Sequence, residues 1–270
     1  MIPAAFDYVQ AASLEEAAAA LAEHGDEAKV LAGGQSLIPL MRLRLAQPSV
    51  LVDVGRVGGL DGIRRENGTL VVGALARHVD IAASDVVRDA VPLLSEMAAE
   101  VGDQQVRNLG TMGGVMAHGD AAGDYGALAR LLDAEIVTTK RTHSAASFFQ
   151  DLFTTALEPD ELVTEVRFPV LSGGHAYIKW RRRLYDWALA GVAVQRDGDA
   201  WRVGYVALGA TPIRGAAVER ALAQGAVAAD AAQACTQDIE PRDDVRATAD
   251  YRRHLAAVIT RRALQQAGAA

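Results

Sequence analysis

The sequence predicts an α+β protein with a larger first domain and a smaller sheet-and-helix domain after it. Short apolar runs bounded by glycine, proline and polar residues recur before residue 170, as strands do, and segments with helical spacing of apolar residues lie between them. Leu171-Ser172-Gly173-Gly174 is the clearest linker in the chain. We therefore expect a boundary near residue 173, between residues 1–172 and residues 173–270.

The first expected elements are a helix and a strand. Ser13 begins a capping-box pattern, the apolar run 14–21 follows it, and Gly25 stands where a helix C-cap is expected. The run 28–31 predicts a short strand. This strand leads directly into the glycine-rich segment 32–36.

Strands and helices then alternate up to the linker. The run 86–101 has apolar residues at helical spacing and predicts one helix that ends at Gly102. A second glycine-rich segment follows at 108–114. The other elements expected in this domain are a helix at 125–132 and strands at 50–54, 69–75, 134–138 and 162–168.

The second domain is expected to combine a small sheet with helices. After the run 176–180, two strand-like runs lie at 188–195 and 201–208. The Asp197-Gly198-Asp199 between them is a hairpin turn signal. The remainder is rich in alanine and predicts helices, the last of them the amphipathic stretch 250–266.

Composition and charge exclude several classes of function. The net charge of −7 and the isoelectric point near 5.4 argue against nucleic-acid binding, which needs clustered lysine and arginine. No run approaches the roughly 18 apolar residues of a membrane span, and the N-terminus does not resemble a signal peptide. The single cysteine, Cys235, excludes an internal disulfide and an iron–sulfur cluster held by this chain alone. We expect a cytoplasmic protein.

The two glycine-rich segments are the strongest functional signal. Glycines in tandem allow the backbone to approach a ligand closely and let successive N–H groups converge on an anion, and Ser36 and Thr111 add hydroxyl groups. Each segment alone is also compatible with an ordinary tight turn. Neither has the Rossmann spacing or the P-loop spacing. Together they suit a pyrophosphate held between two loops.

Longer stretches around these loops resemble a known family. Residues 32–45, which read AGGQSLIPLMRLRL, and residues 102–114, which read GDQQVRNLGTMGG, resemble the two FAD loops in the medium subunits of aerobic carbon monoxide dehydrogenases and related molybdenum hydroxylases of the xanthine dehydrogenase family. The second match continues through Asp120 and Asp124. Further matches at 148–157, 177–188, 251–255 and 261–264 extend the resemblance over essentially the whole chain.

The resemblance implies a fold and a cofactor. Residues 1–172 would form an FAD-binding domain of the vanillyl-alcohol-oxidase (PCMH) type, with two α/β subdomains at about 1–57 and 58–172. Residues 173–270 would form a C-terminal domain like that of carbon monoxide dehydrogenase flavoproteins. FAD would be bound without a covalent bond, by Ala32, Gly33, Gly34, Gln35, Ser36, Leu37, Gly102, Val106, Gly110, Thr111, Gly113, Gly114, Ala117, His118, Asp120, Asp124, Leu162, Val163, Lys179 and Tyr185.

The resemblance also implies where parts of the cofactor would lie. The two glycine loops would hold the pyrophosphate from opposite sides. Asp124, Leu162 and Val163 would lie near the adenosine or ribityl portion, and Lys179 and Tyr185 near the isoalloxazine ring. Asp120 is interpreted as a turn residue and Asp124 as a carboxylate that binds a hydroxyl group. Trp187 could stack on the ring or belong to the core, and His118 could border the flavin or be structural.

The implied function is electron transfer within a complex. Substrate would be hydroxylated at a molybdenum centre in a large subunit, and two [2Fe–2S] clusters in a small subunit would pass electrons to the flavin, which delivers them to an external acceptor. The assembly would be a dimer of heterotrimers. The chain would need no catalytic residue and no metal ligand of its own, because the cofactor carries the chemistry. The substrate and the acceptor are not specified by this sequence.

Two other classes of function remain open from the residues. One is a free-standing flavin oxidoreductase, although no residue stands out as a base above the ring. The other is a non-catalytic nucleotide-binding scaffold, although both loops keep their glycines.

The sequence departs from the family at Gln35, where many relatives have histidine, and at Met112, where many have isoleucine. Gln35 forms hydrogen bonds but does not titrate, so this change concerns the properties of the flavin more than its binding.

Overall fold

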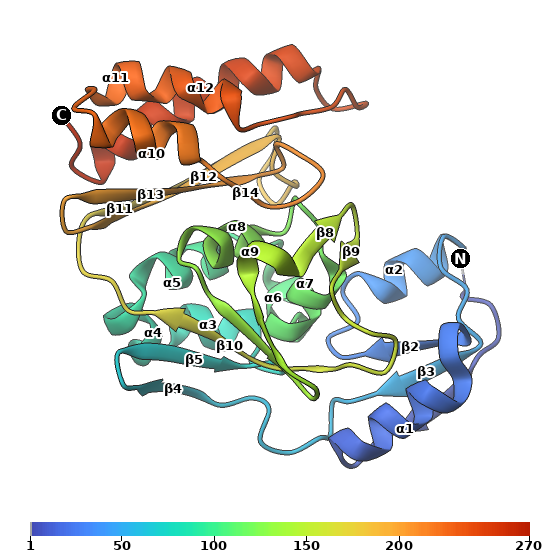
Figure 1. The fold of residues 1–270 in the computed structure, drawn as a ribbon. Helices are drawn as coiled ribbons and strands as arrows, with labels where there is room; N and C mark the ends of the chain where they lie inside the picture. The colour runs from blue at the N-terminus through green and yellow to red at the C-terminus, as the bar shows by residue number, and fades with distance from the viewer. Residues whose placement is uncertain (1) are drawn as a thin grey trace.

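The computed structural model describes residues 2–270, which form three units that follow one another along the chain (Figure 1). The first unit is a three-stranded parallel sheet in the order β1-β3-β2, with an apolar core beneath helix α1. Its elements are β1 (Asp7–Gln10), α1 (Leu14–His24), a 3₁₀ turn (Gly25–Glu27), β2 (Ala28–Leu31), α2 (Leu37–Arg42) and β3 (Val50–Asp53).

The predicted start and end of α1 are confirmed. The Ser13 hydroxyl accepts a hydrogen bond from the Glu16 N–H at 3.2 Å, and the Glu16 carboxylate accepts one from the Ala12 N–H at 2.8 Å. At the other end Gly25 has a φ of 53°, and its N–H donates to the Leu21 carbonyl. The helix is therefore fixed by local side chains, as the sequence predicts.

The second unit surrounds a five-stranded antiparallel sheet in the order β4-β5-β10-β6-β7. The strands are β4 (Ile63–Glu66), β5 (Thr69–Gly73), β6 (Glu135–Thr138), β7 (Thr142–Ser144) and β10 (Val163–Pro169), with a two-stranded ribbon of β8 (Phe149–Asp151) and β9 (Thr154–Thr155). The helices, which share a large apolar core with the sheet, are α3 (His78–Ala83), α4 (Asp85–Ala90), α5 (Pro92–Ala99), α6 (Gln104–Leu109), α7 (Met112–His118), α8 (Asp124–Leu131) and α9 (Ala145–Phe148).

The prediction of one continuous helix over 86–101 is wrong. The chain forms α4 and α5 instead, separated at Val91, whose φ of −141° and ψ of 73° are not helical. Pro92 lacks an N–H and restricts the residue before it, so the first helix ends there and the second begins with Pro92 in its first turn.

The second glycine-rich segment is also more helical than the sequence predicts. The Asp103 carboxylate accepts from the Val106 N–H at 2.9 Å and begins α6, and the Thr111 hydroxyl accepts from the Gly114 N–H at 3.2 Å and begins α7. Gly119, with a φ of 63°, ends α7. Side-chain caps therefore convert most of an expected loop into two short helices.

The third unit is a four-stranded antiparallel sheet in strand order β11 to β14, covered by helices on one face. Its elements are β11 (His175–Trp180), β12 (Ala190–Asp197), β13 (Ala200–Val206), β14 (Ile213–Arg214), α10 (Ala216–Ala223), α11 (Ala228–Ala231), a 3₁₀ segment (Ala232–Gln237) that contains Cys235, and α12 (Ala249–Gln266). Asp197 pairs with Ala200 across the predicted hairpin turn, which is confirmed. The uncovered face of this sheet lies on α5 and α8 of the second unit (Figure 1).

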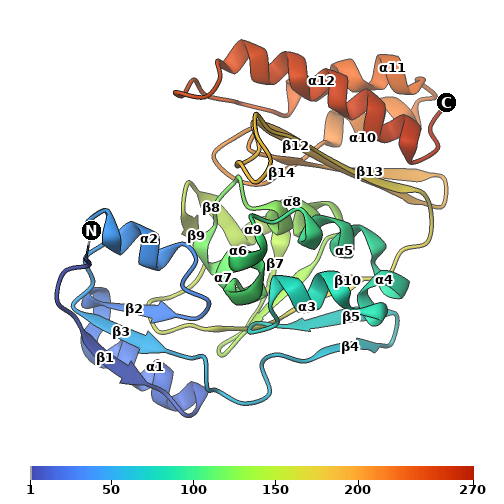
Figure 2. The same ribbon diagram turned by 180° about the vertical axis from the view of Figure 1, so that it is seen from behind.

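The predicted α+β class is confirmed, and the arrangement of the units positions the candidate site. The first unit lies beside the second, with α2 on the side of α6 and α7 (Figure 2). In residues 2–270 no helix is long and apolar enough to cross a membrane.

Candidate functional site

A cavity of about 640 Å³ lies where the three units meet. This volume falls within the range of sites that bind a cofactor or other small molecule. Its walls come from the β2–α2 loop, from α6 and α7, from the start of β10, and from β11 and the loop after it. The structure brings every one of the residues predicted to bind FAD to this cavity, from Ala32 in the first unit to Tyr185 in the third.

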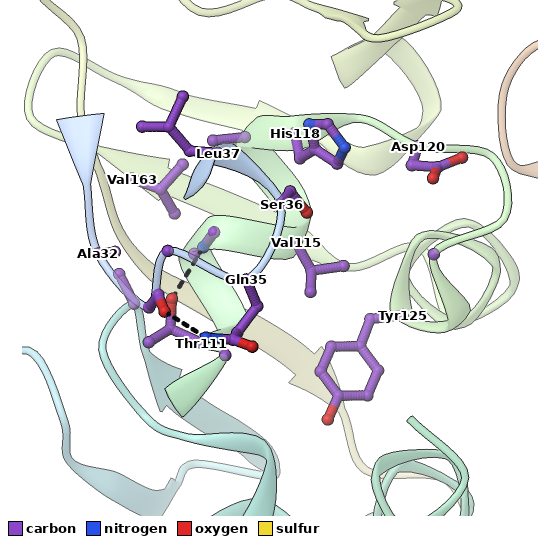
Figure 3. Close-up of a pocket in the computed structure, with 18 of the residues that line it drawn as sticks. Ala32, Gln35, Ser36, Leu37, Thr111, Val115, His118, Asp120, Tyr125 and Val163 are labelled. Carbon is purple, nitrogen blue, oxygen red and sulfur yellow. Dashed lines mark hydrogen bonds between the residues drawn. The ribbon is translucent and has the colours of Figure 1, made fainter. Parts of the chain in front are cut away.

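The two glycine loops touch each other at one edge of the cavity. A Cβ atom built on Gly33 would lie 2.1 Å from the Leu109 carbonyl oxygen and 2.8 Å from the Gly110 Cα. Gly34 has a φ of 69°, which favours glycine. Figure 3 shows the loop that carries Gln35 and Ser36 curled beside the helix that begins at Thr111. This contact between backbones requires glycine and fixes the separation of the loops.

The first loop offers free hydrogen-bond donors. In the part of the chain that the structure describes, the backbone N–H groups of residues 33–36 donate no hydrogen bond to another backbone or side-chain group. The Gln35 side chain instead donates from Nε2 to the Gly33 carbonyl at 3.1 Å, which holds the loop in this shape (Figure 3). Successive unpaired N–H groups beside a cavity suit an anionic group such as a phosphate.

Two buried polar atoms in the cavity wall have no partner among the described residues, namely His78 Nδ1 and the Tyr125 hydroxyl. Both side chains are buried, and the rings meet edge to face at 5.2 Å between centroids. Buried polar groups normally form hydrogen bonds, so these two mark a place where a bound group or an ordered water would complete the wall. Neither residue is predicted from the sequence, because an isolated histidine or tyrosine carries no spacing signal.

Burial lowers the pKa of His78 to about 4, with a smaller contribution from the positive charge of Arg107. A histidine in an unfolded chain has a pKa near 6.5. Between about pH 4 and 6.5 the unfolded state therefore binds a proton that the folded state does not, so stability rises with pH in this window. We predict that His78→Gln removes a pH-dependent contribution of roughly 3 kcal/mol to the free energy of unfolding. Urea denaturation of the wild type and the variant from pH 4.5 to 7.5 measures this contribution. An equally steep rise of stability with pH in both proteins would contradict the prediction.

Asp120 and Asp124 have different surroundings. The Asp120 carboxylate accepts from the Ala122 N–H at 2.8 Å, which confirms its interpretation as a turn residue. Asp124 is 5% exposed and forms an ion pair with Lys179 at 2.8 Å, and it also accepts a hydrogen bond from the Tyr177 hydroxyl. Burial raises the pKa of Asp124, against the opposing effects of Lys179 and Tyr177. The expected contact of Asp124 with a cofactor hydroxyl remains a prediction.

Aromatic side chains border the cavity on the side of the third unit. Tyr185 is 54% exposed and Trp187 is 53% exposed, so the alternative that placed Trp187 in the core is wrong. His118 lies against Phe153, with 5.0 Å between ring centroids, and burial lowers its pKa. Exposed rings beside a cavity offer flat apolar surfaces to a planar ligand. Within residues 2–270 no group of three or more histidine, cysteine, aspartate or glutamate side chains is placed to hold a metal ion.

The fold and the site define a class of protein. Two touching glycine loops with free N–H groups, a cavity of cofactor size and an aromatic border suit a dinucleotide cofactor. Residues 4–171 match the family described as the FAD binding domain in molybdopterin dehydrogenase, and residues 175–267 match the CO dehydrogenase flavoprotein C-terminal domain. The chain belongs to the FAD-binding medium subunits of the molybdenum hydroxylases, and it is an oxidoreductase subunit whose cofactor is FAD.

Two relatives match over nearly their whole length. The carbon monoxide dehydrogenase medium chain of Hydrogenophaga pseudoflava is 39% identical, with 100% of this chain and 99% of the relative covered. The alpha subunit of the 6-hydroxypseudooxynicotine dehydrogenase complex of Paenarthrobacter nicotinovorans is 36% identical, with 99% and 96% covered. The family resemblance predicted from the sequence is thereby confirmed.

Solved structures have the same fold. The carbon monoxide dehydrogenase of Hydrogenophaga pseudoflava contains a chain with a TM-score of 0.92 and 39% identity, with 99% of this chain and 98% of that chain covered. A chain of quinoline 2-oxidoreductase from Pseudomonas putida 86 also has a TM-score of 0.92, at 33% identity and with the same coverage. Both the FAD-binding part and the C-terminal part of the predicted fold are confirmed.

Proposed function

We propose that the cavity binds FAD with its pyrophosphate between the loops at 32–36 and 110–114. The observation that carries this proposal is the contact of Gly33 with Leu109 and Gly110, beside N–H groups that have no other partner. The pyrophosphate would accept hydrogen bonds from the first loop, and Thr111 would approach it from the other side. The remaining predicted residues would line the path of the cofactor: Leu37, Gly102, Val106, Gly113, Gly114, Ala117, His118, Asp120, Asp124, Leu162 and Val163.

The isoalloxazine ring would lie at the end of the cavity formed by the third unit. There β11 contributes Lys179, and the loop after it contributes Tyr185 and Trp187. Bound FAD supplies the ability to accept electrons from one-electron donors and to release them to other acceptors. The chain itself would orient the ring, exclude water from its faces and hold charge near it. On this proposal residues 1–172 are the FAD-binding domain, and the boundary near residue 173 separates it from a C-terminal domain that completes the pocket.

We further propose that the chain works in the cytoplasm between two partner subunits. A small iron–sulfur subunit would donate electrons, and a large molybdopterin-binding subunit would oxidise the substrate, in a dimer of heterotrimers. Four exposed apolar or aromatic side chains line the cavity or the smaller hollow of about 300 Å³ beside it: Leu152, Phe153, Tyr185 and Trp187. Exposed apolar side chains gathered in one place are typical of a surface that another protein covers.

The substrate would be selected outside this chain. Subunits of carbon monoxide, 6-hydroxypseudooxynicotine, caffeine and glyceraldehyde dehydrogenases are 35% to 39% identical to it, with little difference among them. The sequence identity of these subunits to this chain therefore does not depend on the substrate for which each enzyme is named. This supports a shared electron-transfer role and leaves both the substrate and the acceptor to other parts of the complex.

An absorption spectrum tests the proposal directly. The chain is purified alone and with the products of its neighbouring genes, and each sample is denatured to release and quantify FAD. We expect flavin bands and about one FAD per chain, with iron–sulfur absorbance only in the co-purified complex. FAD bound to a chain that never captures partners would favour a free-standing oxidoreductase. Failure of both samples to bind added FAD would favour the scaffold alternative.

A further inference from the structure

One face of β11 packs against the second unit beside the cavity. Side chains alternate along a strand, so residues two apart point to the same side. His175 lies 3.1 Å from the Glu96 carboxylate, and Lys179 Nζ donates to the Glu100 carbonyl at 3.0 Å. Arg181, which follows the strand, lies 2.5 Å from the Glu100 carboxylate. This face of β11 therefore packs against α5 and Glu100, and Tyr177 lies on it between His175 and Lys179.

Tyr177 and Lys179 hold the same carboxylate. The Tyr177 hydroxyl donates to Asp124 Oδ1, and Lys179 Nζ donates to Asp124 Oδ2 at 2.8 Å. The Asp124 residue is 5% exposed and the Lys179 side chain 6%. Asp124 and Lys179 line the cavity, whereas Tyr177 does not. It packs against the apolar core of the second unit and a small cluster of Ala127, Ala188 and Val206. Tyr177 thus lies behind the ion pair rather than in the pocket.

Removal of the Tyr177 hydroxyl would change the net charge that Asp124 and Lys179 together place in the cavity wall. A buried carboxylate depends on its donors to remain charged, because burial disfavours the charged form. The hydrogen bond from Tyr177 favours the charged form of Asp124 next to the ammonium group of Lys179. Without that donor the Asp124 carboxylate would be positioned less firmly and its charged form would be less favoured. The positive charge of Lys179 would then be less neutralised and would act more strongly on the cavity.

We infer that Tyr177 is a positioning residue that holds Asp124 against Lys179 and thereby sets the reduction potential of the bound flavin. The inference rests on the proposed function, which places the isoalloxazine ring beside Lys179. Reduction adds negative charge to the ring, so a less neutralised lysine favours the reduced form. Tyr177 therefore keeps the potential lower than Lys179 alone would make it.

The test is a reductive titration of the flavin bands in the FAD-containing complex. Y177F and D124N should both shift the midpoint potential to more positive values, and K179M should shift it to more negative values. Because Tyr177 acts through Asp124, the double variant Y177F/D124N should show the same shift as D124N alone. The matched control is Y205F, which removes the hydroxyl of a buried tyrosine that contacts Thr260 at 3.2 Å and does not line the cavity. Y205F should leave the potential at the wild-type value.

The possible outcomes separate the inference from the proposed function. If Y177F and Y205F lower the melting temperature alike and neither changes the potential, Tyr177 is merely structural. A further shift on adding Y177F to D124N would also overturn the inference. If the wild type binds FAD but K179M leaves the potential unchanged, Lys179 is not beside the ring; the inference and the proposed position of the ring then fail, whereas FAD binding in the cavity stands. If Y177F does not fold, 3-fluorotyrosine placed at position 177 strengthens the donated hydrogen bond and should shift the potential to more negative values. Absence of FAD from the wild-type complex overturns the proposed function itself.

Discussion

Gly33→Ala should abolish tight binding of FAD. Its Cβ would lie 2.1 Å from the Leu109 carbonyl oxygen, a backbone atom that can move only if one of the two loops moves. The displaced N–H groups of the first loop would then lose the proposed contacts with the pyrophosphate. Loss of two hydrogen bonds to a charged group, at about 1.5 kcal/mol each, corresponds to roughly 100-fold weaker binding. Titration of the FAD-free protein with FAD, followed by flavin fluorescence, measures the effect.

Gly58→Ala is the matched control for this prediction. It introduces the same methyl group at a glycine whose φ is not in the positive region, and no atom lies within 4 Å of the new Cβ. This variant should bind FAD as the wild type does. Similar affinities for the two variants would show that the contact between the loops does not control binding, and the pyrophosphate would then have to lie elsewhere.

Local signals in the sequence were sufficient for much of the fold. The cap at Ser13 and the glycine at position 25 define α1, and the turn at Gly198 defines the hairpin of the third unit. Each of these features depends on residues a few positions apart. The helix expected over 86–101 shows the limit of hydrophobic periodicity as a signal. The apolar spacing continues through Pro92, but the helical backbone is interrupted there.

The cavity wall shows what local patterns cannot provide. Tyr177 and Lys179 meet Asp124 across 53 and 55 positions of the sequence, and no spacing rule relates them. The predicted positions of Asp124 and Lys179 came from resemblance to a family, which does not say that the two side chains pair with each other. His78 and Tyr125 were missed for the same reason, since their importance arises from burial without partners.

A second buried carboxylate, that of Glu161, supports the wall of the cavity. Glu161 is 4% exposed, lines the cavity and immediately precedes Leu162 and Val163 at the start of β10. Oε1 accepts from Thr138 at 2.6 Å and lies 2.9 Å from His143 Nε2, while Oε2 accepts from the Glu158 N–H at 3.0 Å and from Arg141 at 3.2 Å. One carboxylate therefore joins the β6–β7 hairpin to β10, so the position of that wall depends on it.

Glu161→Gln should be among the most destabilising conservative substitutions in the chain. The amide group would present N–H bonds to donors that now contact a carboxylate oxygen, and breaking a buried charged network of this kind costs roughly 3 kcal/mol. For a chain of this size the melting temperature should fall by roughly 10 °C. Glu158→Gln is the control, because Glu158 also contacts Arg141 but is partly exposed, and such surface pairs contribute little. Equal melting temperatures for the two variants would contradict the prediction.

The same variant should change how the protein responds to acid. Burial alone would raise the pKa of Glu161, but hydrogen bonds from Thr138, the Glu158 N–H, His143 and Arg141 lower it to about 2. An unfolded glutamate has a pKa near 4.3, so the stabilisation is present above that value and is lost as the pH falls toward 2. His78 acts in a separate window, between about pH 4 and 6.5. In urea denaturation at a series of pH values, Glu161→Gln should therefore flatten the pH dependence below about pH 4.5 and leave the slope above it unchanged. Flattening in both windows would instead mean that the two groups titrate as one unit through the cavity wall.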